Sequence, residues 1–344
     1  MLCVCSALLG SKLERKIVRE WSEIQSSYIV CIKLRIKLLY IMKLLHKSHL
    51  TYIDTFLSHA KGDFSKSYDI HSDGKIISYR PWSKRLWVSK PNCFRNTTNI
   101  YEHSTGIVNS LRQANTKFWD KKRKATAREL ATYQGFPKSF KLPKAYAQNL
   151  FGNSIAVPVV THILSTYIPK APTTMLDICA GIGGFHIAAK QVFPNIKCIG
   201  FYEIKKPAIR CYQKNFPTTP LLGDLTLETA PFCDLLCAGF PCQPFSCINK
   251  LTHGEKHKNY DMIDHIVNKI KESQCKYFVL ENVAAFAKSP NFDRVKHIPS
   301  YHIQHTILNA CDFGLKQSRN RVYIIGIRRS GSDKTKCTRR RSRK

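Results

Sequence analysis

Short apolar runs and helical patterns alternate through the second half of this 344-residue chain. The apolar runs predict five strands, at Thr174–Cys179, Lys197–Tyr202, Cys233–Ala238, Tyr277–Leu280 and Val322–Ile327. The stretches between them predict helices over Phe185–Val192, Pro207–Asn215 and Met262–Glu272. Strands that alternate with helices of about 10 to 15 residues are typical of a parallel sheet with helices on both faces. The pattern therefore predicts an α/β, Rossmann-like fold built on a mostly parallel sheet.

The first 118 residues lack this alternation and differ in composition. They interleave aromatic with basic side chains: Tyr79, Trp82, Trp87 and Phe94 with Arg80, Lys84, Arg85, Lys90 and Arg95. Such a mixture is typical of a nucleic-acid surface, and equally of a small β-rich core with a solvated rim, so both interpretations stay open. A chain of this length is also consistent with two domains.

Positive charge dominates the chain and is unevenly distributed. Its 55 Lys and Arg residues against 23 Asp and Glu give a formal net charge of +32. The net charge is +17 over residues 1–144, +7 over 145–327 and +8 over 328–344. A protein this basic is expected to have an anionic partner, of which nucleic acid is the first candidate. Residues 329–344, basic and poor in apolar side chains, are predicted to form a disordered tail.

Several classes of protein are disfavoured by the sequence. The 14 cysteines show no regular spacing and no second ligand pair for zinc, which favours reduced thiols inside a cell and no metal site. The most apolar stretch, Tyr28–Leu45, contains four Lys or Arg residues and so does not predict a membrane span. No secretory signal is recognisable. The first 41 residues are an uncertain part of the protein, because Met42 opens an equally plausible chain.

Polar groups at three successive strand ends indicate a cofactor. Ala180-Gly181-Ile182-Gly183-Gly184 follows the first predicted strand, and its glycines allow backbone amides to approach a ligand, although any tight turn can be glycine-rich. Glu203 ends the second strand, where an acidic residue commonly binds a ribose hydroxyl pair. Asp224 follows a third apparent strand end and can accept a hydrogen bond from an adenine amino group. Together they favour an adenosine-containing cofactor.

Cys242 is the candidate nucleophile. It follows the predicted strand Cys233–Ala238, in the crevice at the carboxyl ends of parallel strands, and the prolines at positions 241 and 244 hold its loop rigid. The alternative is a buried structural thiol, which is how most cysteines behave.

Glu281 and two arginines complete the candidate chemistry. Glu281 stands at the tip of the next strand, where it could cap a helix or, beside a nucleophile, act as an acid toward a heterocycle. Arg319 and Arg321 are two residues apart in an extended segment, so they share a side; they could face a phosphate or the active site, or mark an exposed edge.

In this order the four blocks resemble the cytosine-5 DNA methyltransferase family, over about residues 120–328. They correspond to its S-adenosyl-L-methionine (AdoMet) loop, its Pro-Cys-Gln nucleophile loop, its Glu-Asn-Val strand tip and its Gln-x-Arg-x-Arg motif. Arg128–Pro137 and Gly152–Val159 resemble the family's ninth and tenth motifs, yet both precede the AdoMet loop. The chain is therefore identified as a circularly permuted member with an AdoMet-dependent methyltransferase fold.

The resemblance implies a domain plan. Residues 1–118 would form a smaller target-recognition domain, and residues 119–328 the catalytic domain, with the permuted motifs at 128–160. Residues 329–344 would be the tail. Termini that lie close together make such a permutation physically acceptable.

The resemblance also implies a mechanism and partners. Cys242 would attack C6 of a cytosine flipped out of double-stranded DNA, Glu281 would hold N3 and the exocyclic amine, and Arg321 and Arg319 would steady the ring and the Cys242 loop. AdoMet would contact Asn153, Ser154, Ile178, Cys179, Ala180, Gly181, Gly183, Gly184, Phe185, Glu203, Ile204, Asp224, Leu225 and Pro241. The protein would be a monomer. It would belong to a restriction–modification system, with a cognate restriction endonuclease as genetic partner. In a prokaryote it would be cytoplasmic and nucleoid-associated.

The sequence departs from the family in three places, and two alternatives remain. Cys179 stands where the family usually has an aromatic residue, and Ile204 where a large residue is common, which predicts weaker AdoMet binding. Residues 246–262 lack the usual fifth motif. A transfer-RNA cytosine-5 methyltransferase, or a catalytically silent homologue that only binds DNA, would share most of these features.

Overall fold

The computed structural model describes residues 47–72, 75–81, 84–89, 97–101, 106–109, 116–118, 120–242, 245 and 261–329. The chain divides into two compact units, Met1–Gly62 and Asp63–Lys344. In the first unit, α3 (Lys47–Ala60) is the described helix. The segment before residue 42, the interleaved Trp82, Lys90, Phe94 and Arg95, and the predicted tail beyond Arg329 lie outside the described residues. The predicted limits of the recognition and catalytic domains stay predictions.

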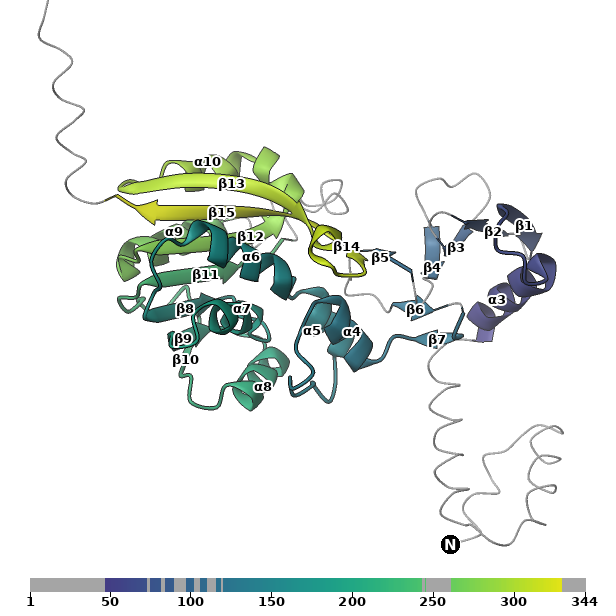
Figure 1. The fold of residues 1–344 in the computed structure, drawn as a ribbon, viewed down its shortest axis with the longest axis horizontal. Coiled ribbons are helices and arrows are strands. Elements are labelled where there is room, and N and C mark those ends of the chain that lie inside the picture. The colour runs from purple at the N-terminus through teal and green to yellow at the C-terminus, as the bar shows by residue number, and fades with distance from the viewer. Residues whose placement is uncertain are drawn as a thin grey trace, which may run out of the picture. The chain divides into compact units, whose positions relative to one another are not determined.

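A seven-stranded sheet dominates the second unit (Figure 1). Its strands are β8 (Thr174–Ile178), β9 (Lys197–Tyr202), β10 (Leu221–Gly223), β11 (Leu235–Gly239), β12 (Tyr277–Val283), β13 (Tyr301–Asn309) and β15 (Asn320–Arg328). They are ordered β10-β9-β8-β11-β12-β15-β13, and within this sheet β15 alone runs opposite to the other six strands. The predicted mostly parallel sheet is confirmed. The edge strand β13 was not predicted, because polar residues interrupt its sequence and leave no apolar run longer than two residues.

Helices cover both faces of the sheet, as predicted. The helices of the second unit are α4 (Ala127–Tyr133), α5 (Ala147–Gly152), α6 (Val157–Tyr167), α7 (Gly184–Val192), α8 (Lys206–Asn215), α9 (Met262–Ser273) and α10 (Pro290–Lys296), with short 3₁₀ turns η4 (Ala284–Lys288) and η5 (Ala310–Phe313). Consecutive residues of β8 enter different hydrophobic clusters. Met175 joins side chains of α6 and α7, and Leu176 joins those of α9 and α10. Period-two alternation within a strand buried on both sides produces these two cores.

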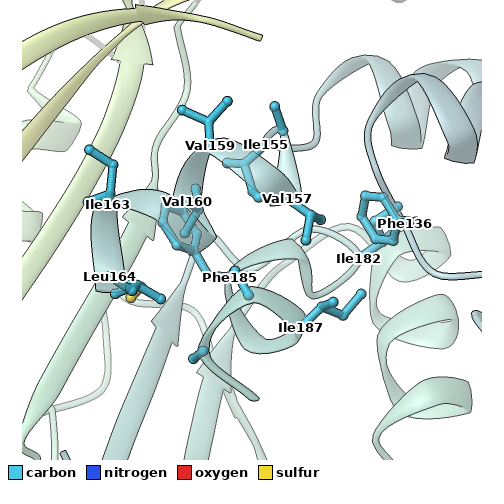
Figure 2. Packing of buried hydrophobic residues seen from close by; sticks show 14 of the residues in the cluster. Phe136, Ile155, Val157, Val159, Val160, Ile163, Leu164, Ile182, Phe185 and Ile187 are labelled. Atoms are coloured by element: carbon cyan, nitrogen blue, oxygen red, sulfur yellow. The ribbon is translucent and has the colours of Figure 1, made fainter. Parts of the chain in front are cut away.

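Helix α6 contributes to the hydrophobic cluster that lies beside the glycine loop (Figure 2). Its apolar residues Val157, Val160, Ile163 and Leu164 recur at helical spacing and are buried in the cluster that contains Phe185 of α7. The segment that resembles the tenth motif therefore packs on the central sheet, although it precedes the first strand of that sheet in sequence.

A small antiparallel sheet accounts for part of residues 1–118. It consists of β1 (Tyr68–Ser72), β2 (Lys75–Arg80), β3 (Arg85–Ser89) and β4 (Thr97–Tyr101), joined in sequential order. Ile77, Tyr79, Leu86 and Val88 are buried. The β-rich interpretation thus holds for this segment, while a role in nucleic-acid binding stays a prediction.

Two short pairings follow this sheet along the chain. β5 (Val108–Asn109) pairs in parallel with β14 (Gln317–Ser318), and β6 (Lys117–Phe118) pairs with β7 (Arg123–Lys124).

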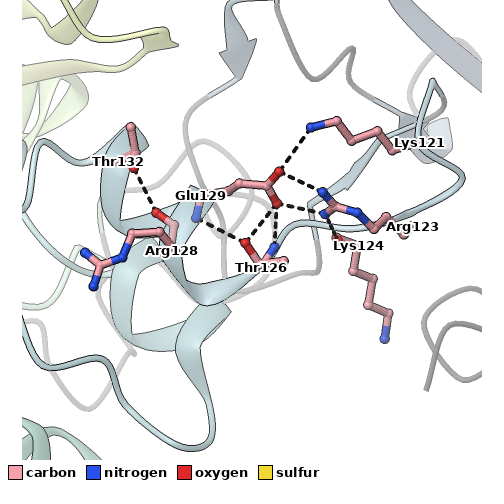
Figure 3. A network of polar contacts seen from close by, with 7 residues as sticks. All are labelled: Lys121, Arg123, Lys124, Thr126, Arg128, Glu129 and Thr132. Carbon is pink, nitrogen blue, oxygen red and sulfur yellow. Dashed lines mark hydrogen bonds and ion pairs between the residues drawn. The ribbon is translucent and has the colours of Figure 1, made fainter. Parts of the chain in front are cut away.

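An ion-pair network fixes the start of α4 (Figure 3). Thr126 caps the helix by accepting from the N–H of Glu129, and the Glu129 carboxylate accepts in return from the N–H of Thr126. The Arg123 guanidinium donates to both Glu129 oxygens at 2.8 Å, and Lys121 adds a third cationic contact at 3.2 Å. These bonds, above all those from Arg123, lower the pKa of Glu129 to about 2.

Replacing Glu129 with glutamine is expected to lower the free energy of unfolding by about 1 to 2 kcal/mol at neutral pH, less than the full pKa shift implies because solvent screens a partly exposed pair. A lowered pKa stabilises the fold above the ordinary glutamate value of 4.5, and this stability is lost as the pH falls toward 2. Denaturant unfolding should show that the difference in free energy of unfolding between the wild type and Glu129→Gln is smaller at about pH 3 than at about pH 7. Glu228→Gln, at an exposed position, is the control, and an equal loss in both variants would contradict the assignment.

Candidate active site

A cavity of about 410 Å³ opens at the carboxyl ends of the parallel strands. The loops that follow β8, β9, β10 and β11 contribute to it, together with the tip of β12, residues 319–321 and the end of α5. Parallel strands bring their carboxyl ends to one edge of the sheet, which is why residues spread over the sequence meet here.

Most of the predicted site residues line this one cavity. They are Asn153, Cys179, Gly181, Glu203, Ile204, Asp224, Leu225, Pro241, Cys242, Glu281, Arg319 and Arg321. Six others do not line it and are buried behind it: Ser154, Ile178, Ala180, Gly183, Gly184 and Phe185. The cavity thus brings the predicted cofactor residues and the predicted catalytic residues into the same space.

Ten lining residues were not predicted: Asn149, Leu150, Gly152, Tyr202, Lys205, Ala208, Gly223, Gly239, Phe240 and Met262. Half of them, Gly152, Tyr202, Lys205, Gly223 and Phe240, adjoin a predicted residue in sequence. Asn149 lies one helical turn before Asn153, whose Nδ2 donates to the carbonyl of Asn149 at 2.9 Å. Helical spacing from Asn153 would have found it.

The turn after β8 needs its glycines for conformation and for space. Gly181 and Gly183 have φ values of +55° and +87°, and Cys179 adopts +52° in the same turn. A Cβ on Gly183 would meet the ring of Phe216 at 2.6 Å, and one on Gly184 would meet Ile155 at 2.7 Å. Gly183 and Gly184 therefore permit a sharp strand-to-helix turn and close packing behind the cavity wall.

Two carboxylates are held at neighbouring strand tips. Glu203 accepts hydrogen bonds of 2.9 Å from the N–H groups of Gly181, Ile204 and Lys205, so its orientation is set by the backbone of two loops. Asp224 accepts from the N–H and hydroxyl of Thr226, which lowers the pKa of Asp224 and keeps it ionised. Acceptors for ribose hydroxyls and an adenine amino group, beside a glycine turn, fit an adenosine-containing cofactor.

A buried acid lies behind the glycine turn. Asp177 of β8 is 0% exposed, and neither of its carboxylate oxygens has a hydrogen-bond partner of good geometry among the described residues. Burial raises the pKa of Asp177 well above its usual range; the Tyr212 hydroxyl and the N–H of His186 offset part of the rise, and the Glu203 charge adds to it. Burial also lowers the pKa of His186 to about 4, so its ring, 3.0 Å from the Tyr212 hydroxyl, stays neutral.

The end of the cavity near Cys242 contains a nearly buried ion pair. Arg321 Nε lies 3.0 Å from Glu281 Oε1, and the two side chains are only 13% and 9% exposed. Burial raises the pKa of the nearby Cys242 thiol, and the Glu281 charge raises it further, while Arg321 and Arg319 act in the opposite direction. Without a substrate, Cys242 is therefore predominantly a thiol.

The loop that carries Cys242 is anchored on both sides. Asn282 Nδ2 donates to the carbonyl of Phe240 at 3.3 Å, which ties the tip of β12 to this loop. The N–H of Phe245 donates to the Cys242 carbonyl at 3.1 Å, and the Phe245 ring packs edge-on against Phe286. Residues 243–244 and 246–260, which include the atypical fifth-motif segment, lie outside the described residues.

Arg319 has contacts that the sequence did not reveal. The Arg319 guanidinium donates to the carbonyls of Gly152 and Ser154 at 3.2 and 2.7 Å, and the Arg319 backbone N–H donates to Asn309 Oδ1 at 2.8 Å. One of the two predicted catalytic arginines thus also binds the segment that forms a cavity wall.

Neither a metal centre nor a membrane span is found in the part of the chain that the structure describes. No group of three or more His, Cys, Asp or Glu side chains there is arranged to hold a metal ion. None of the described helices combines the length and the apolar character that a bilayer crossing requires.

Comparison with known proteins gives three findings. The family model for C-5 cytosine-specific DNA methylase matches residues 23–168 and 173–343. The type II methyltransferases M.BsuFI of Bacillus subtilis and M.HpaII of Haemophilus parainfluenzae are 34% and 37% identical to the chain, over 45% and 46% of its length. The chain covers 39% and 46% of these two relatives, less than half of either. A crystal structure of the S. pombe Dnmt2 methyltransferase aligns with a TM-score of 0.39 and 22% identity, over 46% of this chain and 51% of that one.

Asp177→Asn is expected to raise the melting temperature by several degrees at about pH 8 and to have little effect near pH 4. A raised pKa means that stability is highest below the ordinary aspartate value of 3.8 and is lost as the pH rises, and asparagine cannot ionise. Thermal melts across this pH range measure the effect. Asp234→Asn is the matched control of opposite sign, since Thr173 and Lys276 bind that carboxylate and its pKa is lowered to about 2. A lower melting temperature for Asp177→Asn at about pH 8 would show that the carboxylate is stabilised in ionised form.

Proposed function

We propose that this chain, which belongs to the family of C-5 cytosine-specific DNA methylases, transfers a methyl group from AdoMet to C5 of cytosine in double-stranded DNA. The observation that carries the proposal is the shared cavity: Cys242 and the Glu281–Arg321 pair line the same 410 Å³ space as Glu203 and Asp224. A nucleophile and a carboxylate–guanidinium pair are thereby in reach of a methyl donor held by the two strand-tip acids.

The nucleophile must be activated by the substrate. Cys242 starts as a thiol, because burial and the Glu281 charge both raise its pKa. The Glu281 carboxylate, paired with Arg321, takes the thiol proton of Cys242, passes it to cytosine N3 and accepts a hydrogen bond from the exocyclic amine. The sulfur then forms a bond to C6 while the ring electrons move to C5, as covalent catalysis requires at a carbon that is a poor nucleophile.

AdoMet, when bound, supplies the methyl group that C5 takes. The C5 proton then leaves to a water molecule, the C6–sulfur bond breaks, and the N3 proton returns through Glu281 to the sulfur, so that the ring is aromatic again and the Cys242 thiol and the Glu281 carboxylate are regenerated. Arg321 holds Glu281 in place through the 3.0 Å contact throughout. The target base must leave the duplex stack for Cys242 to reach it.

The remaining assignments extend this proposal. Residues 1–118 would recognise the target sequence. The predicted cofactor residues that line the cavity would hold AdoMet, and Ser154 and Phe185 would support them from behind. The packing of α6 in the core with α7, before β8 in sequence, supports circular permutation. A restriction–modification role with a partner endonuclease, a monomeric state and a cytoplasmic location are part of the same proposal, and the names of the type II relatives favour the first.

Cys242→Ala is expected to abolish transfer of labelled methyl groups from AdoMet to duplex DNA, because the covalent step is lost. Scintillation counting of purified DNA measures the transfer. Cys211→Ala, a cysteine that does not line the cavity, is the matched control and should retain activity. Equal labelling by the Cys242 variant would refute the mechanism.

A duplex that contains 5-fluorocytosine separates the alternatives. Fluorine at C5 cannot leave as a proton, so the C6–sulfur adduct should persist and shift the protein on a denaturing gel, in the wild type and not in Cys242→Ala. A trapped adduct on tRNA alone would select the transfer-RNA methyltransferase. Specific DNA binding with no adduct and no methylation would select the silent homologue.

A further inference from the structure

Two buried glutamines lie behind one wall of the cavity, beside the buried Arg319 that lines it. Gln134, which follows α4, and Gln317 of β14 are both 0% exposed, and Arg319 is 4% exposed. Neither glutamine lines the cavity. Buried polar side chains are costly unless they are hydrogen-bonded, so their partners indicate what they do.

Their partners are carbonyls of the segment that ends α5. Gln134 Nε2 donates to the carbonyl of Phe151 at 2.6 Å and lies 3.3 Å from that of Ser154. Arg319 donates to the carbonyls of Gly152 and Ser154. The last carbonyls of a helix lack partners within the helix. Here the buried side chains add donors to the backbone N–H groups of Asn153 and Ser154, which already donate to the carbonyl of Phe151.

Gln317 joins the two other donors into one network. Its Nε2 donates to the carbonyl of Tyr133 at 2.8 Å and to Gln134 Oε1 at 3.2 Å. This orients the Gln134 amide so that its NH₂ group points at the wall segment, since the amide oxygen is already engaged. Gln317 therefore acts on the wall through Gln134.

The wall segment depends on such outside contacts. α5 has only six residues, too few for a helix that is stable on its own, and its N-cap residue Tyr146 makes no side-chain capping bond. Yet Asn149, Leu150, Gly152 and Asn153 of this segment line the cavity. Besides the apolar packing of Leu150 and Phe151, its position is thus set by hydrogen bonds from Gln134 and from Arg319, both distant in sequence.

We infer that Gln134 and Gln317 are positioning residues for AdoMet: they hold the wall formed by residues 149–153 in the geometry that binds the cofactor. The inference rests on the proposed function and names the residues on which its cofactor affinity depends. Residues 317–321 then serve both ends of the cavity, because the same short segment carries Arg321 with its contact to Glu281.

Gln134→Met and Gln317→Met test the inference, since methionine keeps the side-chain length and removes the amide. Isothermal titration of each full-length variant with AdoMet, in the absence of DNA, should show binding weakened roughly tenfold, the effect expected when buried carbonyls lose their donors. At saturating AdoMet, kcat should stay within about twofold of wild type and KM for DNA should not change, because the Glu281–Arg321 pair is untouched. The double variant should bind about as weakly as the worse single variant, as residues of one network do.

Gln191→Met, at an exposed position of α7, is the matched control and should bind AdoMet like the wild type. If the wild type itself fails to bind AdoMet, the proposed function is wrong. If the wild type binds and both folded variants bind equally well, or if kcat falls while affinity is unchanged, the positioning role is overturned. Should Gln134→Met not fold, Gln317→Asn, which keeps the amide but shortens its reach, decides the question by the same titration.

Discussion

Burial of the central parallel strands on both faces is the constraint from which the rest of the structure follows. Residues of β8, β11 and β12 face one hydrophobic cluster or the other, so almost no polar side chain fits along their length. Polar chemistry is displaced to the strand tips, and parallel strands place those tips at one edge. Asp177 is the exception within β8, and it is tolerated as a neutral acid beneath the glycine turn. The arrangement of the sheet alone therefore brings the polar residues at the strand tips together around the cavity.

The electrostatics of this cavity keep the Cys242 sulfur protonated when no substrate is bound. Glu281 and Arg321 compensate each other's charge in a nearly dry environment, where an unpaired ion would be costly. The same carboxylate disfavours the Cys242 thiolate. In the proposed mechanism, the sulfur becomes reactive when a bound cytosine takes over its proton. In the proposed mechanism, this coupling ties the reactivity of the sulfur to a correctly placed heterocycle and protects the thiol from unproductive reactions.

The cofactor side is assembled from segments far apart in the chain. Residues 128–160 pack against strands that come later in sequence, and their contacts with residues 317–319 pass through buried amide and guanidinium groups. Packing of this kind depends on proximity and hydrogen-bond geometry, and the order in which the chain connects the pieces does not enter. A permuted connection can therefore support the same cavity.

From the sequence, period-two and helical patterns predicted the parallel strands, the helices between them and the polar residues at their tips, because each of these depends on local alternation and on turn chemistry. Strand β13 escaped, since a half-exposed edge strand has no apolar run. Local patterns also could not reveal that Arg319 binds the carbonyls of Gly152 and Ser154, or that Gln134 and Gln317 support a cavity wall without lining it. The sequence by itself determined which residues can do chemistry and at which strand ends they stand. Only the tertiary structure decided which of them share a cavity and which act from behind it, because buried hydrogen bonds between distant segments leave no periodic trace in the chain.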